Sequence, residues 1–308
     1  MTMIVDFPPE CLLRIFHFLS NETTDTSLWR TPGWEQQYYQ CQSDIASICL
    51  VSVQWRSLAQ PMLWKLVYIT DEGLQNQANT VAKSILASPV LGRFRTTEVF
   101  FQGSEIRPKL WKRLMEGLVG IQRLRMLQED APVKMDEEWL GLSTLKELRF
   151  LELDYHFNPS SKSKVTRTHF QLNTLILGHL VDSPTVIKAL ITSSSETLTT
   201  LSRRRSYSSE MHQALSEVFP LLATSLETFY LDGQSPGLEK SVSSFKSLKR
   251  VWIEYYLMED LSFIDTFVKA LPTSVTTLNV HLGSYLEDDK FSSSIDTGGI
   301  RRSQALCE

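Results

Sequence analysis

The chain has 308 residues, of which 42% are hydrophobic and 21% charged, and its formal net charge is −4. This composition excludes a disordered chain, a collagen and a disulfide-rich miniprotein, and the charge gives no basic balance that would favour nucleic acid as a partner. Forty-three residues are leucine. Because excess leucine without a membrane span is typical of helices or leucine-rich repeats, repeats are the first pattern to seek.

The four cysteines, Cys11, Cys41, Cys49 and Cys307, form no C-x-x-C pair and match no disulfide or zinc spacing. We therefore expect the cysteines to be free thiols, which is typical of a protein in a reducing compartment. The N-terminus has no basic segment of the kind that opens a signal peptide, and the longest apolar stretch, residues 45–53, is about half the length of a membrane span. We therefore expect a cytoplasmic or nuclear protein without a membrane partner.

The N-terminal part of the chain predicts two helical blocks separated by a polar loop. Pro9 and Glu10 suit a first helical turn, and Leu12, Ile15, Phe16 and Leu19 then follow at i, i+3, i+4 and i+7. The stretch 21–43 is polar and predicts a loop. Helical spacing resumes after Asp44, a plausible N-cap, and continues to Leu63-Trp64 with Pro61 opening or bending the last segment.

These two blocks, FPPECLLRIFHFL and DIASICLVSVQWRSLAQPMLW, resemble the F-box in its fungal form. The family pattern begins with Leu-Pro-x-Glu and an amphipathic helix, and its second half reads L-V-S-x-x-W-R-x-L before a closing Leu-Trp. The chain departs from that pattern at Phe7, where leucine is usual, at Val53, where a basic residue is common, and in the length of its loop.

The resemblance implies that residues 1–65 dock on a Skp-family adaptor, which bridges to a cullin. It assigns adaptor contacts to Pro8, Pro9, Leu12, Ile15, Phe16, Leu50, Val51 and Trp55. The alternative is that these residues are only the internal core of a helical hairpin. An amphipathic stripe indicates burial without naming what covers it, so we expect about half of them to be core alone.

From residue 94 onward a short apolar pattern recurs about every 26 residues, within the range of leucine-rich repeats. Its period-2 alternation predicts a short strand in each copy, with helical segments over 110–118, 183–191, 210–222 and 261–271 between copies. The clearest copies are LRFLEL, LNTLIL, LETFYL, LKRVWI and VTTLNV, and the eight copies start at Phe94, Ile121, Leu148, Leu172, Leu198, Leu226, Leu248 and Val275.

Residues 66–282 resemble the leucine-rich-repeat regions that follow many F-boxes. The asparagine that normally closes each strand is replaced by His156, Leu180 and Gln234. We expect an α+β protein in which the helical F-box precedes an irregular α/β leucine-rich-repeat solenoid, a horseshoe, followed by a polar tail over 283–308. A plain α/β domain stays open as the alternative.

In such a solenoid, alternate strand residues point out from the concave face. The expected central column is Glu98, Arg125, Glu152, Ile176, Ser202, Tyr230, Trp252 and Asn279. Exposed aromatic residues flanked by acids favour a protein partner. A target protein is therefore expected to bind Arg125, Glu152, Tyr230, Asp232, Trp252, Glu254 and Tyr255. Alternatively, Tyr230 and Trp252 lie under a loop or pack on each other.

No motif of an enzyme is present: the chain has no G-x-G-x-x-G, P-loop, G-x-S-x-G or H-E-x-x-H. The six histidines never pair at i, i+4, so no metal site is expected. Arg203-Arg204-Arg205 is the one basic run; it would suit a phosphorylated partner but more often simply solvates a surface strand. We expect no catalytic residue, cofactor or metal.

The resulting hypothesis is a non-catalytic substrate-recognition adaptor of an SCF-type ubiquitin ligase. The F-box would bind the Skp adaptor, and the repeats would bind a target for ubiquitination. Two alternatives remain: a scaffold that binds the adaptor outside ubiquitination, and a truncated, non-functional paralogue, because the repeats have no convincing polar cap at their end.

Overall fold

The computed structural model describes residues 8–14, 34–70, 77–103, 106–128, 134–157, 165–203, 209–232, 238–256 and 262–283. Nine strands form one sheet: β1 (Leu66–Thr70), β2 (Glu98–Gly103), β3 (Arg123–Gln128), β4 (Phe150–Asp154), β5 (Thr174–Leu177), β6 (Thr200–Arg203), β7 (Thr228–Asp232), β8 (Arg250–Tyr256) and β9 (Thr277–Gly283). Every strand pairs in parallel with the strand that follows it along the chain.

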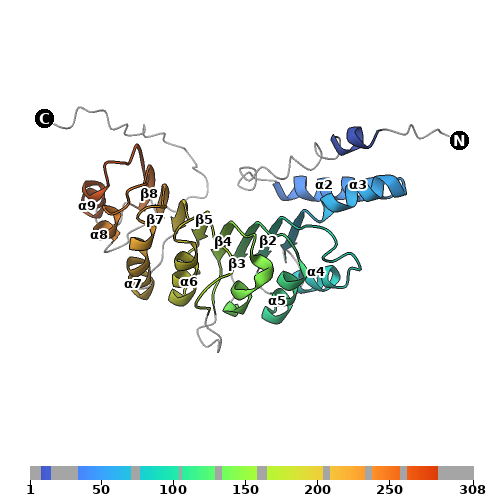
Figure 1. Ribbon diagram of the computed structural model, residues 1–308, viewed down its shortest axis with the longest axis horizontal. Helices are drawn as coiled ribbons and strands as arrows, with labels where there is room; N and C mark the ends of the chain where they lie inside the picture. The colour runs from blue at the N-terminus through green and yellow to red at the C-terminus, as the bar shows by residue number, and fades with distance from the viewer. Residues whose placement is uncertain are drawn as a thin grey trace.

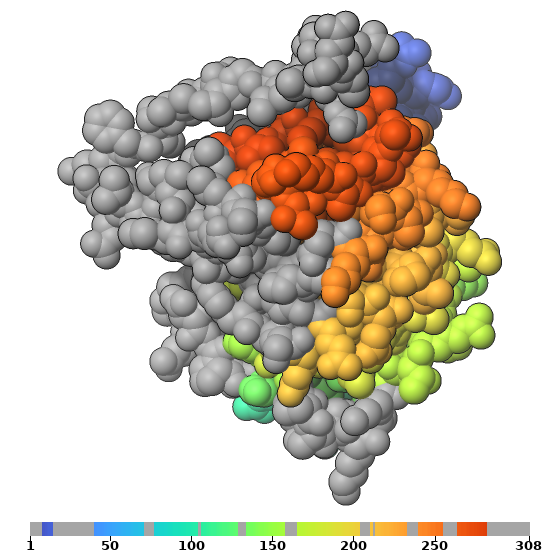
Figure 2. Space-filling model, turned by 90° about the vertical axis from the view of Figure 1, so that its left-hand side faces the viewer, coloured from blue at the N-terminus to red at the C-terminus, as the bar shows by residue number. Residues whose placement is uncertain are grey.

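The helices that connect the strands lie along one face of the sheet (Figure 1). Figure 2 views the molecule from the β9 end. The colours of its surface run from red through orange and yellow to green, so segments that follow one another in the chain lie side by side. The connecting helices are α4 (Gln77–Leu86), α5 (Pro108–Gly117), the 3₁₀ turns η2 (Glu137–Gly141) and η3 (Ser143–Leu145), α6 (Pro184–Ser194), α7 (Ser209–Val218) with η4 (Phe219–Leu222), α8 (Leu238–Val242) and α9 (Ser262–Ala270).

The fold class expected from the sequence is wrong. The chain is not an α+β protein with a helical F-box followed by a leucine-rich-repeat solenoid. It is an α/β fold built on one continuous nine-stranded parallel sheet with alternating helices, and the sheet is not a solenoid. A strand pattern that recurs with a helix between copies is common to parallel α/β sheets in general, so the period alone does not separate the two classes. The plain α/β alternative agrees with this sheet.

The predicted strand positions are nevertheless confirmed. Seven strands, β3 to β9, begin two residues after the predicted start of their copy, and β2 begins four residues after Phe94. The predicted helices are also present as α5, α6, α7 with η4, and α9. Ser183 caps α6 as expected, since its hydroxyl accepts a hydrogen bond from the Val186 amide at 3.4 Å. The sequence patterns missed β1, α4, α8 and the 3₁₀ turns η2 and η3.

The main core lies between the sheet and the connecting helices. In β3 the burial alternates, so that Leu124 and Met126 are fully buried while their neighbours are half-exposed. Trp111 of α5 and Trp139 of η2 meet edge to face, with ring centroids 6.0 Å apart. Burying a large apolar side chain stabilises a fold by roughly 1.5–3 kcal/mol, so this interior provides much of the driving force for folding.

Acceptors other than asparagine hold the segments that follow β4 and β5. The Gln128 side chain accepts a hydrogen bond from the His156 amide at 3.0 Å, and the Asp154 carboxylate accepts one from the Leu180 amide at 2.9 Å. These acceptors come from the preceding strand, and they satisfy backbone donors that the missing asparagine ladder would otherwise bond.

The N-terminal helical unit consists of residues 9–14, α2 (Trp34–Cys49) and α3 (Val53–Leu63). The predicted loop over 21–43 is wrong for 34–43, and its residues 21–33 lie outside the described part. Residues 34–43 contain no glycine or proline and several glutamines, so helix propensity continues unbroken from Trp34. Asp44 is therefore no N-cap; it lies inside α2 and accepts a hydrogen bond from Gln40 at 2.8 Å.

One prediction for the basic run is also wrong. Arg203 lies in β6 with only 4% of its surface exposed, so it does not solvate a surface strand. It is in register with Leu177 and Leu231, which face the core. Burial lowers the pKa of its guanidinium to about 10. Arg204 and Arg205 lie outside the described residues.

Candidate functional site

The N-terminal helical unit has a small hydrophobic core of its own. Leu12, at 1% exposure, packs with Ile45, Cys49 and Ala59, all of which are buried. Ile48, Trp55, Leu58, Met62 and Leu63 cover this cluster from its edges. The unit continues directly into the sheet, since α3 is in contact with β1. Four buried side chains make a small core, which is typical of a module that gains stability by docking.

Two side-chain hydrogen bonds add to the backbone hydrogen bonds that hold the turn between α2 and α3. The Ser52 hydroxyl accepts one from the Trp55 amide at 3.1 Å and so caps α3. The Arg56 side chain donates one from Nε to the Cys49 carbonyl at 3.1 Å, which satisfies a carbonyl at the end of α2. Burial raises the pKa of the Cys49 thiol, and the nearby Arg56 offsets part of that rise. The turn is therefore a fixed element.

This fixed turn exposes an apolar surface. Leu50 is 79% exposed, Val51 45% and Val53 82%. Among the described residues only two other large aliphatic side chains, Val119 and Leu221, are classed as exposed. We call residues 50–53 the apolar turn. Large apolar side chains gathered on one rigid turn are characteristic of a surface that another protein covers.

The structure divides the predicted adaptor contacts into three groups. Leu12 is core, and Trp55 packs on the cluster while remaining partly exposed. Leu50 and Val51 are exposed, as are Pro8 and Pro9 at the start of the first helical segment. Ile15 and Phe16 lie outside the described residues. The predicted adaptor contacts omitted Val53, because the family pattern favours a basic residue at that position. The sequence could have indicated it, since Leu50, Val51 and Val53 are three apolar residues next to Ser52, a plausible helix N-cap.

The face of the sheet turned away from α4–α7 carries the expected column of side chains. Strand pairing places Arg125, Glu152, Ile176, Ser202, Tyr230, Trp252 and Asn279 in one row, as predicted. Glu98 is not in this row. Phe100 pairs with Arg125, and Tyr68 pairs with Phe100. The row therefore starts with two aromatic residues on β1 and β2.

The β1–β4 part of this row is buried. Tyr68 and Phe100 form a satellite cluster with Leu66, and their rings are 5.2 Å apart. The Arg125 guanidinium lies 5.1 Å from the Phe100 ring centroid, and its Nε is 2.5 Å from the Glu152 carboxylate. Glu152 is 2% exposed. Arg125 and Glu152 therefore form an internal ion pair, which corrects their expected placement on an exposed surface.

The β7–β9 part of the face is more accessible. Tyr230 and Trp252 are half-buried, and the Tyr230 hydroxyl donates a hydrogen bond to Glu254. The other Glu254 oxygen is 3.8 Å from His281 on β9. Asp232 pairs in register with Glu254. The Tyr255 side chain lies outside the described residues. Aromatic and acidic groups thus meet here, and Tyr230 and Trp252 are cross-strand neighbours in this row.

The described residues contain no cluster of three or more histidine, cysteine, aspartate or glutamate side chains suited to a metal ion. In that same part of the chain, no helix has both the length and the apolar character needed to cross a membrane. The sequence matches no protein-family model and no curated protein.

Proposed function

We propose that the protein is a non-catalytic substrate-recognition adaptor of an SCF-type ubiquitin ligase. The N-terminal helical unit, which resembles an F-box, binds a Skp-family adaptor through the apolar turn. The face of β7–β9 binds the target protein. The adaptor and its cullin then bring the target close to a ubiquitin-conjugating enzyme, which raises the effective concentration of the reacting groups without chemistry by this chain.

The exposure of Leu50 and Val53 on a hydrogen-bonded turn is the observation that supports this proposal. Leaving two large apolar side chains about four-fifths in water forgoes the transfer free energy that burial would provide. A partner that covers them recovers this free energy. The turn is already fixed by Ser52 and Arg56, so little conformational entropy is lost when the partner binds.

Co-purification with the Skp adaptor tests the first half of the proposal. Wild-type chain should retain the adaptor, and Leu50→Asp with Val53→Asp should reduce the retained amount at least about tenfold, because two charges would be buried without partners. The matched control is Val119→Asp with Leu221→Asp, which changes the other two exposed aliphatic residues. No adaptor on the wild-type chain, or equal loss in the control, overturns the proposal.

Two further measurements separate the roles. Cullin in the same complex indicates ubiquitin ligation, whereas adaptor without cullin favours the scaffold alternative. For the target surface, proximity labelling by the wild-type chain is compared with labelling by Trp252→Ala. Labelled proteins that disappear with Trp252→Ala and persist with Leu50→Asp/Val53→Asp identify targets bound at β7–β9. An unchanged set of labelled proteins contradicts that assignment.

A further inference from the structure

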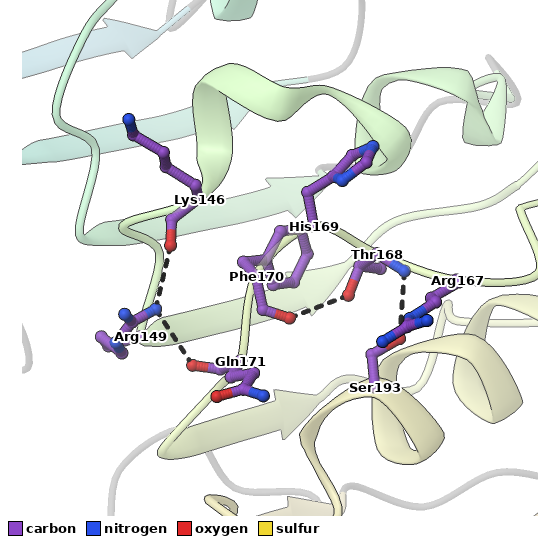
Figure 3. Close-up of a pocket in the computed structure, with 8 residues that line it drawn as sticks. All are labelled: Lys146, Arg149, Arg167, Thr168, His169, Phe170, Gln171 and Ser193. Atoms are coloured by element: carbon purple, nitrogen blue, oxygen red, sulfur yellow. Dashed lines mark hydrogen bonds between the residues drawn. The ribbon is translucent and has the colours of Figure 1, made fainter.

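A cavity of about 510 Å³ lies at the edge of the sheet where β4 and β5 begin, away from the apolar turn. Its walls come from the segment before β4, the loop before β5 and the end of α6. Figure 3 shows the buried Phe170 between Lys146 and Arg149 on one side and Arg167 and His169 on the other, with the Lys146 and His169 side chains extending away from the ring. None of the residues that line it is acidic. A cavity of this size falls within the range of small-molecule sites.

Most of the basic side chains at this cavity lack an anionic partner among the described residues. Elsewhere in the described chain many lysines and arginines form ion pairs, such as Lys112 with Glu138 and Lys188 with Glu217. Glu147 is adjacent to Lys146 in sequence but pairs with Arg95 instead. In the part of the chain that the structure describes, no carboxylate lies at ion-pair distance from Lys146, Arg167 or His169. Lys146 and Arg167, together with the Arg149 guanidinium, which bonds only backbone carbonyls, produce a positive local potential around the cavity.

The frame of the cavity is fixed before any ligand arrives. The Nη1 atom of Arg149 donates to the carbonyls of Lys146, Leu148 and Gln171 at 3.1, 2.9 and 3.3 Å. Its Nε and Nη2 groups make no hydrogen bond within the described residues, so they remain as donors. The loop before β5 is tied to α6, because the Thr168 amide donates to the Ser193 hydroxyl at 3.0 Å. An arginine held by one nitrogen presents the other two in a constant geometry.

We propose that this cavity binds a small organic molecule through a phosphate monoester. The phosphate is a compact dianion with three acceptor oxygens. It matches the free guanidinium donors of Arg149 and Arg167 and the point charge of Lys146. The size of the cavity leaves room for the organic part beside the phosphate. This assignment is independent of the adaptor proposal, since it uses none of the same residues.

Isothermal titration of the full chain with glycerol 2-phosphate and ribose 5-phosphate tests the assignment, with ribose as the uncharged control. We expect both phosphates to bind, ribose not to bind, and the affinity to fall as salt is raised. Lys146→Ala with Arg167→Ala should weaken binding about tenfold or more for each cation removed. Neither side chain makes a hydrogen bond within the described residues, so the thermal midpoint should be unchanged.

The matched control is Arg113→Ala with Lys246→Ala, which removes the same charge from exposed positions that do not line the cavity. Its affinity for both phosphates should equal that of the wild-type chain. A phosphoserine peptide is titrated in parallel. Absence of binding by both small phosphates overturns the assignment, and so does binding by the phosphopeptide alone. Equal weakening in the control and cavity variants also overturns it.

Discussion

The buried carboxylate of Glu137 accepts a hydrogen bond from the hydroxyl of Ser183 at 2.8 Å, across 46 residues of chain. Glu137 is 2% exposed and also accepts from the Thr185 hydroxyl at 3.1 Å and the Val165 amide at 3.4 Å. Ser183 is the N-cap of α6, so the negative carboxylate lies at the positive end of that helix. One side chain thus connects η2, the start of the described segment before β5, and the start of α6.

Replacement of Glu137 by alanine should lower the free energy of unfolding by roughly 2–3 kcal/mol, because the buried Val165 amide loses its acceptor and the Ser183 and Thr185 hydroxyls keep only the 2.9 Å hydrogen bond to each other. Glu137→Gln should cost about half as much, since the amide oxygen still accepts. Urea unfolding provides the measurement. The neighbouring Glu138 is the control: its carboxylate is exposed and pairs with Lys112, so Glu138→Ala should cost less than about 1 kcal/mol. Equal losses of unfolding free energy for Glu137→Ala and Glu138→Ala would show that the hydrogen bonds of Glu137 do not stabilise the fold.

Gly178 lies against the Asp154 carboxyl group, which is held by the Leu180 amide. A Cβ atom at position 178 would overlap that carboxyl group, so Gly178→Ala should lower the free energy of unfolding by about 2–3 kcal/mol. Thermal unfolding measures the loss. Gly141→Ala is the control, because a Cβ atom at position 141 would meet nothing within 4 Å, and it should be neutral or slightly stabilising.

Glu98 should destabilise the folded chain as the pH rises. Burial raises the pKa of its carboxyl group, and the positive charges of Arg123, Lys65 and Arg125 only partly offset this rise. The proton is therefore bound more tightly in the folded state. The stability that this protonation provides is complete below about pH 4.5 and is lost as the pH rises through the folded pKa.

Glu98→Gln removes the loss of stability that follows deprotonation of Glu98, because the amide does not ionise. The variant should gain stability relative to the wild-type chain as the pH rises above about 4.5, as buried ion pairs replaced by neutral groups often do. Arg123 does not need Glu98, since it lies 4.5 Å from the Phe150 ring centroid and remains partly solvated. Urea unfolding across this pH range measures the difference. Glu147→Gln, at an exposed ion pair, should show little change with pH, and a parallel rise there contradicts the role of burial.

The strands and their register could be predicted from the sequence because both depend on local alternation. Each apolar copy marks a strand, and identical offsets in seven copies place Arg125 through Asn279 in one row. For the copy that starts at Phe94, the predicted register is wrong by two residues. There the continuous run Val99-Phe100-Phe101 is buried on both faces, so alternation disappears and Glu98 is assigned to the wrong row. The same double burial hides β1.

The burial of side chains on the face of the sheet turned away from α4–α7 could not be predicted from this alternation. Alternation tells which side of a strand a residue occupies, but not whether that side meets solvent. Arg125 and Glu152 are charged and point outward, yet their ion pair is buried. The cavity beside β4 and β5 was equally hidden, since Arg167 of the loop before β5 comes beside Lys146 and Arg149 only through the parallel pairing of β4 with β5. Long-range pairing, and not local pattern, creates both features.

The N-terminal unit separates core from contact residues in a way that mutation can measure. Leu12 is almost fully buried against Ile45 and Cys49, whereas Leu50 is 79% exposed. Leu12→Ala should cost about 2–4 kcal/mol, because it removes apolar contacts and leaves a cavity, and Leu50→Ala should change stability by less than about 0.5 kcal/mol. Hydrogen exchange of the α2 and α3 amides reports the local free energy of opening. Faster exchange with Leu12→Ala and unchanged exchange with Leu50→Ala is the expected result. If Leu50→Ala accelerated exchange as much, Leu50 would belong to the core of the unit, and its exposed surface would no longer support adaptor binding.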